Sequence, residues 1–310
     1  MPFSKKTSAT FAGILAIIIW SSTVAVSKKV MTELGTYTAA FYIYFFSGLI
    51  NILILMFFMG AKGFHHQLRM LPFSYYLKTG IFFLSYNIFL YLSIGMSAKD
   101  EDLLIVSLLN YLWPVLIVIL KIPLNHARIR PAPFWIGIIA SVSGIALALF
   151  QGYKAEELIK IMRALDDNFL AFLFAFLGAI SWALYSNLIS RYKTSDDIAA
   201  IPIIFIISGL LFFVLLIFRG EIHNLTLTPI YHNPYLVYTI LGPTCIGYLF
   251  WFLAIKQGNR NLVVSFSYFI PLSSVAFISL LHSIPVRPTF WISAILLVAG
   301  AILGLKAVKE

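Results

Sequence analysis

The sequence predicts an all-α integral membrane protein, with ten transmembrane helices arranged as two inverted five-helix repeats around a central cavity. Of its 310 residues 61% are hydrophobic and 11% are charged, and the mean hydropathy is +0.93, a composition that excludes an ordinary soluble globular protein. Apolar stretches long enough to cross a bilayer recur along the whole chain. In addition, landmark residues of the first half return in the second half in the same order.

Each expected span is an apolar stretch of about 20 residues, the length that a bilayer requires. Charges, prolines or polar clusters bound every stretch, and none alternates with the period of two that barrel strands show. The first stretch is too long for the core of a signal peptide and has no small-residue cleavage site after it, so we expect it to be retained. The ten spans cover roughly 9–28, 37–59, 74–96, 103–122, 134–151, 169–190, 198–218, 235–256, 262–281 and 289–307.

The internal repeat rests on five landmarks whose offset falls gradually from 162 to 156 residues, as expected for two copies of one plan with a small deletion. Because five spans is an odd number, the second copy must enter the membrane from the opposite side, which makes the repeats inverted. The first repeat then covers 1–151 and the second 169–310. The landmark pairs are Trp20 with Trp182, Ser47-Gly48 with Ser208-Gly209, Pro114 with Pro271, Trp135 with Trp291, and Gly144 with Gly300.

The segment 152–168 is expected to link the repeats on the external side. Within it, 155–165 alternates acids, lysine and leucines at helical spacing, which fits either a short amphipathic helix at the interface or a solvated linker. The aromatic pairs that open spans five and ten suit an interfacial belt, so we expect Trp135 and Trp291 to act as anchors. Small residues such as Gly144 and Gly300 in the same spans indicate close-packing faces.

The charge distribution predicts the topology. If the N-terminus is cytoplasmic, 14 of the 22 lysines and arginines fall on that side, against 3 of the 12 acids. The formal net charge of +10 then follows from the positive-inside rule and requires no nucleic acid. We therefore expect both termini in the cytoplasm. A chain with an internal pseudo-dyad can also work as a monomer.

No Asp, Glu, Lys, Arg or His lies near the centre of any expected span. Carriers that are driven by protons usually place a titratable group there, because the proton must bind and leave along the path. The chain also lacks a metal-ligand cluster, a phosphate loop, a nucleophile motif and paired carboxylates. These absences argue against an enzyme, and we expect no cofactor and no metal.

Two proline motifs occupy equivalent positions in spans four and nine: Asn-Tyr-Leu-Trp-Pro at 110–114 and Ser-Tyr-Phe-Ile-Pro at 267–271. A proline inside a span leaves a backbone carbonyl without its hydrogen bond, and in hydrocarbon that group needs another partner. The pair fits broken helices that line a cavity, although a kink satisfied by a nearby Ser or Asn would have the same sequence. The candidate binding residues are Asn110, Trp113, Ser267 and Tyr268, with Pro114 and Pro271 as helix breaks and flexible points for gating.

Aromatic side chains mark the middle of other spans. Tryptophans at mid-span differ from belt residues, and indole N–H and phenol O–H groups buried there need partners, which indicates a polar lumen. Some of these rings will only pack. An aromatic, neutral, hydrogen-bonding cavity suits a zwitterion or cation with an apolar body, since a ring stack contributes ~0.5–1.5 kcal/mol and an ammonium over indole ~0.5–2 kcal/mol. The candidates are Trp20, Tyr86, Trp182 and Tyr185, together with Tyr248 and Trp251.

These motifs resemble the drug/metabolite transporter superfamily with EamA-type repeats, and more narrowly the bacterial aromatic amino acid exporter family of the YddG type. The matching segments run over nearly the whole chain. Asn87 follows Tyr86 at a position where we expect an acid in that family. The resemblance is carried by 13–21, Ser85-Tyr86, 110–114, 169–172 through Trp182-Ala183, and 267–269 with Pro271.

The resemblance implies a basket-like ten-helix fold with a central cavity between the halves, and export of Phe, Tyr and Trp together with other amino acids and toxic aromatic cations. We therefore expect an exporter of the bacterial inner membrane that works by alternating access. The resemblance also implies that Trp20, Tyr86, Trp113 and Trp182 lie along the cavity. Because no acid lies at mid-membrane, we expect uncoupled facilitated diffusion. The alternative is a broad-specificity exporter of drugs or metabolites, with proton coupling. A receptor or scaffold is disfavoured, because the chain has no sizeable soluble domain.

Overall fold

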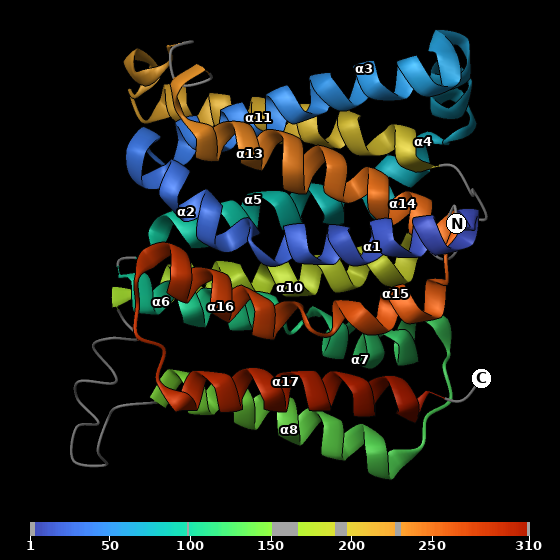
Figure 1. Ribbon diagram of the computed structural model, residues 1–310, viewed down its shortest axis with the longest axis vertical. Coiled ribbons are helices and arrows are strands. Elements are labelled where there is room, and N and C mark those ends of the chain that lie inside the picture. Colours follow the sequence, from blue (N-terminus) through green and yellow to red (C-terminus); the bar gives the residue numbers. More distant parts are fainter. Residues whose placement is uncertain (1–3, 98, 151–166, 190–196, 227–230, 309–310) are drawn as a thin grey trace.

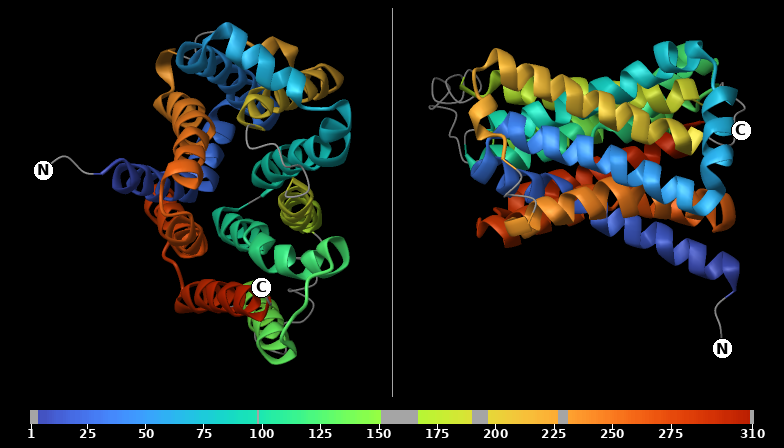
Figure 2. Two further views of the ribbon diagram at one scale, coloured as in Figure 1. Left: turned by 90° about the vertical axis from the view of Figure 1, so that its right-hand side faces the viewer. Right: turned by 90° about the horizontal axis from the view of Figure 1, so that it is seen from above.

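The computed structural model describes residues 4–97, 99–150, 167–189, 197–226 and 231–308. Throughout this part the chain is helical, and its only extended pairing is an isolated bridge between Ile129 and Val308. The helices lie side by side along one direction (Figure 1), and in the end-on view they surround a central region (Figure 2, left). Both termini lie at the same end of the bundle. The all-α fold class is confirmed for the described residues.

The first half contains eight α-helices and a π-helical turn. The helix α3 bends at Gly60, whose φ of 74° lies in the left-handed region that glycine tolerates. The elements are α1 (Lys5–Ser21), α2 (Thr23–Leu34), α3 (Thr36–Met70), α4 (Phe73–Tyr75), the π-helix η1 (Tyr76–Gly80), α5 (Ile81–Met96), α6 (Asp100–Asn110), α7 (Trp113–Asn125) and α8 (Pro131–Phe150).

The second half follows the same order of long helices. A π-helical segment interrupts its third span, where Pro243 has no N–H to continue the α-helical ladder. The elements are α10 (Phe169–Ile189), the 3-10 turn η3 (Asp197–Ala199), α11 (Ala200–Phe218), the 3-10 turn η4 (Ile222–Asn224), α13 (Pro234–Leu241), the π-helix η5 (Gly242–Gly247), α14 (Tyr248–Gln257), α15 (Arg260–Ser267), α16 (Ile270–His282) and α17 (Pro288–Ala307).

Within the described ranges, 8 helical segments could each cross a membrane by length and composition, and a ninth arises if the bent pair α1–α2 counts as one span. The remaining expected span, roughly 262–281, corresponds to α15 and α16, which a break separates into two helices too short to qualify alone. The first two spans run further than the sequence predicted. The first covers Lys5–Leu34 rather than 9–28, and α3 continues beyond 59 to Met70.

The bend in the first span lies at Ser22, where α1 and α2 meet at 42°. The Ser22 hydroxyl donates to the Ile19 carbonyl at 2.7 Å and shares a 2.8 Å hydrogen bond with the Tyr238 hydroxyl. Side-chain bonds of this kind compete with the helical ladder and bend helices. The expected amphipathic helix at 155–165 lies outside the described residues.

The helices pack in pairs that each join the two halves of the chain. The pairs are α8 with α17, α3 with α11, α5 with α10, and α1 with α14. At the contact of α8 with α17, a Cβ added to Gly300 would meet the Gly137 carbonyl oxygen at 2.5 Å, and one added to Gly144 would meet the Ser293 carbonyl oxygen at 2.8 Å. The close-packing faces expected from the small residues are therefore present.

Candidate functional site

Two helix breaks lie at the proline motifs. The helix α6 ends at Asn110 and α7 begins at Trp113, one residue before Pro114. Likewise α15 ends at Ser267 and α16 begins at Ile270, one residue before Pro271. Each proline lacks the N–H that would reach the carbonyl four residues earlier, which belongs to Asn110 in one case and to Ser267 in the other.

The two broken spans match in backbone detail at a constant offset of 157 residues. Their second halves end at His126 and Ser283, which adopt the same left-handed conformation, with φ and ψ of 53° and 35° and of 55° and 36°. The side chains before these caps make equivalent contacts with the neighbouring span. Asn125 Nδ2 approaches the Asn187 carbonyl oxygen at 3.4 Å, and His282 Nε2 lies 2.9 Å from the Ala25 carbonyl oxygen.

Trp182 on α10 is the centre of a ring cluster. Its ring centroid lies 4.8 Å from Tyr86 on α5, 5.5 Å from Tyr185, and 6.3 Å from Trp113 at the start of α7. Trp113 is the first residue of α7, and α7 packs against α10. Four residues chosen from the sequence are thereby brought together.

Trp20 on α1 forms a second ring cluster with α14. Its ring lies 5.1 Å from Tyr248 and 5.3 Å from Trp251. Its indole Nε1 donates to the carbonyl oxygen of Pro243 at 2.9 Å, within the π-helix η5. Gly247 permits this approach, because a Cβ at that position would lie 2.6 Å from Nε1. The indole of Trp20 is therefore held by one hydrogen bond and by close packing against a glycine.

Phe83 on α5 connects the two clusters, a role that sequence analysis missed. Its ring lies 5.7 Å from Trp182, 5.0 Å from Tyr185 and 5.9 Å from Tyr248. Phe83 precedes Tyr86 by three residues and so lies on the same face of the helix. That spacing is the sequence pattern from which Phe83 could have been predicted. We call the connected rings the aromatic network: Trp20, Phe83, Tyr86, Trp113, Trp182, Tyr185, Tyr248 and Trp251.

Asn110 lies beside the aromatic network, with its side chain next to the Tyr86 hydroxyl. The residue is 1% exposed. Its Oδ1 is buried without a hydrogen-bond partner in the described part of the chain. Ser267 and Tyr268, the two candidates from the second proline motif, make other contacts than those of the aromatic network. Ser267 Oγ donates to the Val264 carbonyl oxygen of its own helix at 2.7 Å, and Tyr268 packs in a separate apolar cluster.

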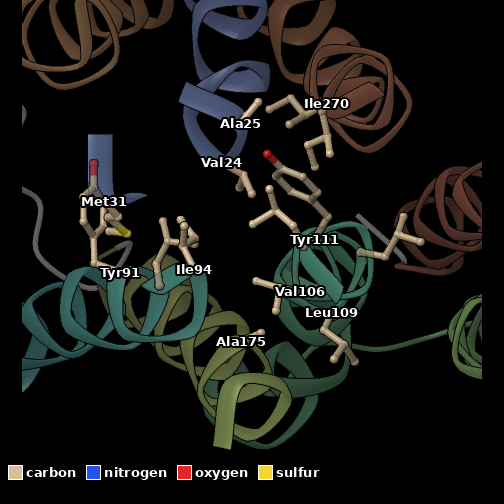
Figure 3. Close-up of a cluster of buried hydrophobic side chains, with 14 of the residues drawn as sticks. Val24, Ala25, Met31, Tyr91, Ile94, Val106, Leu109, Tyr111, Ala175 and Ile270 are labelled. Carbon is tan, nitrogen blue, oxygen red and sulfur yellow. The ribbon is translucent and has the colours of Figure 1, made fainter. Parts of the chain in front are cut away.

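Figure 1 shows α2, α6 and α16 at the end of the bundle opposite the termini, and buried apolar side chains gather between these helices (Figure 3). In that view the Tyr111 ring at the α6 break points toward Ala25 of α2 and Ile270 of α16. Ser107 of α6 and Ser274 of α16 also share a 3.0 Å hydrogen bond between their hydroxyls. The described residues show no comparable packing of α7 against α15 at the other end. The half-helices α6 and α16 therefore pack more closely on each other than α7 and α15 do.

The chemistry of this site is neutral. Among the described residues, no three His, Cys, Asp or Glu side chains gather closely enough to hold a metal ion. The aromatic network presents ring faces, indole N–H groups and phenol hydroxyls, and Asn110 adds a carboxamide. Such a site can bind an aromatic or cationic ligand by stacking, by ring–cation attraction and by hydrogen bonds.

Comparison with known proteins agrees with these features. A family described as "EamA-like transporter family" matches residues 7–150 and again residues 169–305. A protein of Escherichia coli (strain K12) named "Aromatic amino acid exporter YddG" is 28% identical over 307 residues, covering 96% of this chain and 97% of the relative. A protein of Salmonella typhimurium (strain 14028s / SGSC 2262) with the same name is 29% identical over 304 residues, covering 95% of this chain and 96% of the relative.

A solved structure titled "Crystal structure of protein" superposes on this chain with a TM-score of 0.64 and 22% identity, covering 97% of this chain and 98% of that one. At that identity the likeness concerns the fold alone. The family match covers both halves of the chain and most of its length. With its series of apolar helices long enough to cross a bilayer, the chain is a multi-pass membrane protein that belongs to the EamA-like transporter family.

Proposed function

We propose that this protein exports the aromatic amino acids Phe, Tyr and Trp, and other amino acids more weakly, by alternating access and without coupling to an ion. The observation that carries the proposal is the aromatic network, which joins rings from both halves of the chain on α1, α5, α7, α10 and α14. The names of the two relatives, both aromatic amino acid exporters, support the same substrate class.

We propose ten spans in two inverted repeats, with the first repeat at 1–151, a linker at 152–168 and the second repeat at 169–310. The separate family matches to each half support this division. The equal helix breaks, the equal left-handed caps and the paired contacts of Asn125 and His282 support a structural repeat within it. The two contacts lie at opposite ends of the bundle, as an inverted repeat requires.

The aromatic network suits a ligand with a ring. Each favourable ring contact contributes about 0.5–1.5 kcal/mol beyond burial, so two or three contacts bind a free amino acid weakly. Weak binding suits export from a cytosol in which the substrate is plentiful. We place Trp20, Tyr86, Asn110, Trp113, Trp182 and Tyr185 in the binding site. Ser267 and Tyr268 would contribute after α15 and α16 rearrange about Pro271.

Alternating access would use the contrast between the two ends of the bundle. In this conformation α6 and α16 pack together through Ser107 and Ser274, whereas the described residues of α7 and α15 show no comparable packing. We propose that transport exchanges these two arrangements, with Pro114 and Pro271 as the points at which the half-helices swing. The protein would act as a monomer in the bacterial inner membrane, with both termini in the cytoplasm.

The experiment that tests this function is counterflow. Purified protein in liposomes preloaded with unlabelled phenylalanine receives labelled phenylalanine outside, with no pH or voltage difference. Saturable, protein-dependent entry of label is expected. If folded protein takes up label only under an imposed proton gradient, uncoupled transport is refuted, and if it takes up none under either condition, the substrate assignment is refuted.

A broad-specificity exporter is the second candidate, because neutral ring faces also attract lipophilic cations. Competition against labelled phenylalanine separates the two functions. Selective inhibition by Phe, Tyr and Trp supports the first, whereas equal inhibition by an aromatic quaternary ammonium supports the second.

A further inference from the structure

The side-chain oxygen Oδ1 of Asn110 is buried without a hydrogen-bond partner among the described residues. Among the described residues, three buried side-chain atoms make no hydrogen bond: Thr38 Oγ1, Gln67 Oε1 and Asn110 Oδ1. Thr38 lies in the first turn of α3, and Gln67 lies in the part of α3 beyond the Gly60 bend. Only Asn110 lies at a helix break beside the aromatic network. An unpaired buried acceptor costs about 1–3 kcal/mol, which indicates that a partner joins it at some stage.

The same residue has a second acceptor. The carbonyl of Asn110 would bond the N–H of residue 114 in a continuous helix, but residue 114 is a proline. No backbone hydrogen bond across the break ends on that oxygen. The nearby bonds run from Leu112 to the Leu109 carbonyl and from Val115 to the Leu112 carbonyl. Among the described residues, neither the Asn110 carbonyl oxygen nor Oδ1 therefore has a backbone donor.

The neighbour of Oδ1 on α10 has no side chain. On α10 the residue opposite Oδ1 is Gly178, and a Cβ added there would lie 3.7 Å from Oδ1. Trp182 lies one helical turn further along the same face of α10, and its ring contacts Tyr86 at 4.8 Å. A cationic donor at Asn110 would thus lie beside ring faces that attract positive charge.

Building on the proposed function, we propose that the oxygens of Asn110 accept hydrogen bonds from the ammonium group of the transported molecule. Asn110 then determines that the protein binds amines and excludes their deaminated analogues. A primary ammonium carries three N–H donors, enough for both oxygens and one further contact. Because a carboxamide is neutral, it recognises the ammonium without the strong attraction of a carboxylate, which would slow release.

The test compares the binding of two probes that differ in the recognised group. Phenethylamine keeps the ammonium, and 3-phenylpropionate replaces it with a carboxylate at the end of a similar chain. Binding to purified protein is followed by the change in intrinsic tryptophan fluorescence. In the wild type, phenethylamine is expected to bind at least tenfold more tightly, which corresponds to about 1.4 kcal/mol. In Asn110→Leu the two dissociation constants should approach each other.

Stability is measured alongside, because a merely structural asparagine would behave differently. Asn110→Leu removes an unpaired acceptor, so its melting temperature should equal or exceed that of the wild type. Asn51→Leu is the matched control. Asn51 is also buried, at 3% exposed, but its Nδ2 donates to the carbonyl oxygens of Ser47 and Thr244, both at 2.9 Å, so this substitution should lower the melting temperature.

A second variant keeps the proposal falsifiable if Asn110→Leu does not fold. Gly178→Ser places a hydroxyl within reach of Oδ1, where it can donate in place of the ligand. This variant should bind phenethylamine at least tenfold more weakly, while Gly178→Ala should do so to a smaller extent. The proposal is overturned if the wild type does not discriminate between the probes, or if folded Asn110→Leu keeps the wild-type discrimination. Where Asn110→Leu does not fold, retained discrimination by Gly178→Ser overturns it.

Because these measurements report binding rather than transport, they separate the two claims. A protein that binds phenethylamine through Asn110 but shows no phenylalanine counterflow refutes the proposed function and supports this inference. A protein that carries phenylalanine but whose Asn110→Leu variant still distinguishes the two probes refutes the inference and leaves the function in place.

Discussion

Gly247→Ala is the substitution whose effect follows most directly from the structure. Gly247 adopts ordinary helical angles, with φ of −57° and ψ of −49°, so alanine causes no backbone strain there. The added methyl group would instead lie 2.6 Å from Nε1 of Trp20, 3.1 Å from its Cδ1 and 3.3 Å from its Cε2. The indole must therefore move by about 0.8 Å to reach the 3.4 Å at which ordinary contact begins.

The indole has little freedom to make that movement. Its Nε1 is bonded to the Pro243 carbonyl oxygen at 2.9 Å, and its ring is in contact with Tyr248 and Trp251. Overpacking of this kind costs about 1–3 kcal/mol. Loss of the indole hydrogen bond costs about 0.5–1.5 kcal/mol more. Alanine gains about 0.5–1 kcal/mol over glycine inside a helix, so the expected net destabilisation lies in the range of about 0.5–4 kcal/mol.

The assay is thermal unfolding of the purified protein together with phenylalanine counterflow. Gly247→Ala should lower the melting temperature and raise the phenylalanine concentration needed for half-maximal exchange, because Trp20 leaves its position in the aromatic network. Gly80→Ala is the matched control, since it lies at the end of η1 and its added methyl group would find its nearest atom at 3.6 Å. The control should be neutral or slightly stabilised. Equal melting temperatures and equal exchange for the two variants would refute the reasoning about Trp20.

Three other predictions concern the rings and the helix breaks. Trp182→Ala should abolish phenylalanine exchange while the protein stays in the membrane. The control Trp182→Phe should keep part of the activity. Wild-type exchange by Trp182→Ala would exclude this ring from the binding site. Pro114→Ala restores an N–H at the α6–α7 break and should slow exchange more than it alters binding, as measured by initial rates and dissociation constants. The double variant Ser107→Cys and Ser274→Cys should form a disulfide on oxidation, because the native hydroxyl oxygens lie 3.0 Å apart, and should stop exchange until a reductant is added. The single native cysteine, Cys245, is buried and should not interfere with the cross-link. Exchange that continues after complete cross-linking would show that transport does not require this end of the bundle to open.

Much of the architecture could be predicted because its causes are local. A stretch of about 20 apolar residues crosses a bilayer whatever its neighbours are, so the long helices lie where hydropathy placed them. Breaks near Pro114 and Pro271 were expected because proline has no N–H, and α6 and α15 do end just before those residues. By contrast, the bend at Ser22 was not expected. Ser22 at that bend bonds to the Ile19 carbonyl of its own helix and also to the Tyr238 hydroxyl, which is 216 residues away in the chain.

The candidate site could be predicted only in part, because contacts between rings depend on how each helix is rotated and tilted. The sequence indicated mid-span aromatic residues but could not distinguish Trp113, which contacts Trp182, from Tyr268, which belongs to a separate apolar cluster with Val115 and Val298. Phe83 looked like any other apolar residue of its span, although it connects the two ring clusters.

By itself, then, the amino-acid sequence determined that this chain is a helical membrane protein with a doubled plan and with proline breaks at matching positions in the two halves. Those properties depend on the hydropathy and backbone chemistry of short segments. The tertiary structure alone decided which rings meet, which end of the bundle is closed, and that Asn110 keeps an oxygen without a partner. Interhelical packing sets all three, because it fixes the rotation of each helix about its axis against neighbours that are distant in the chain.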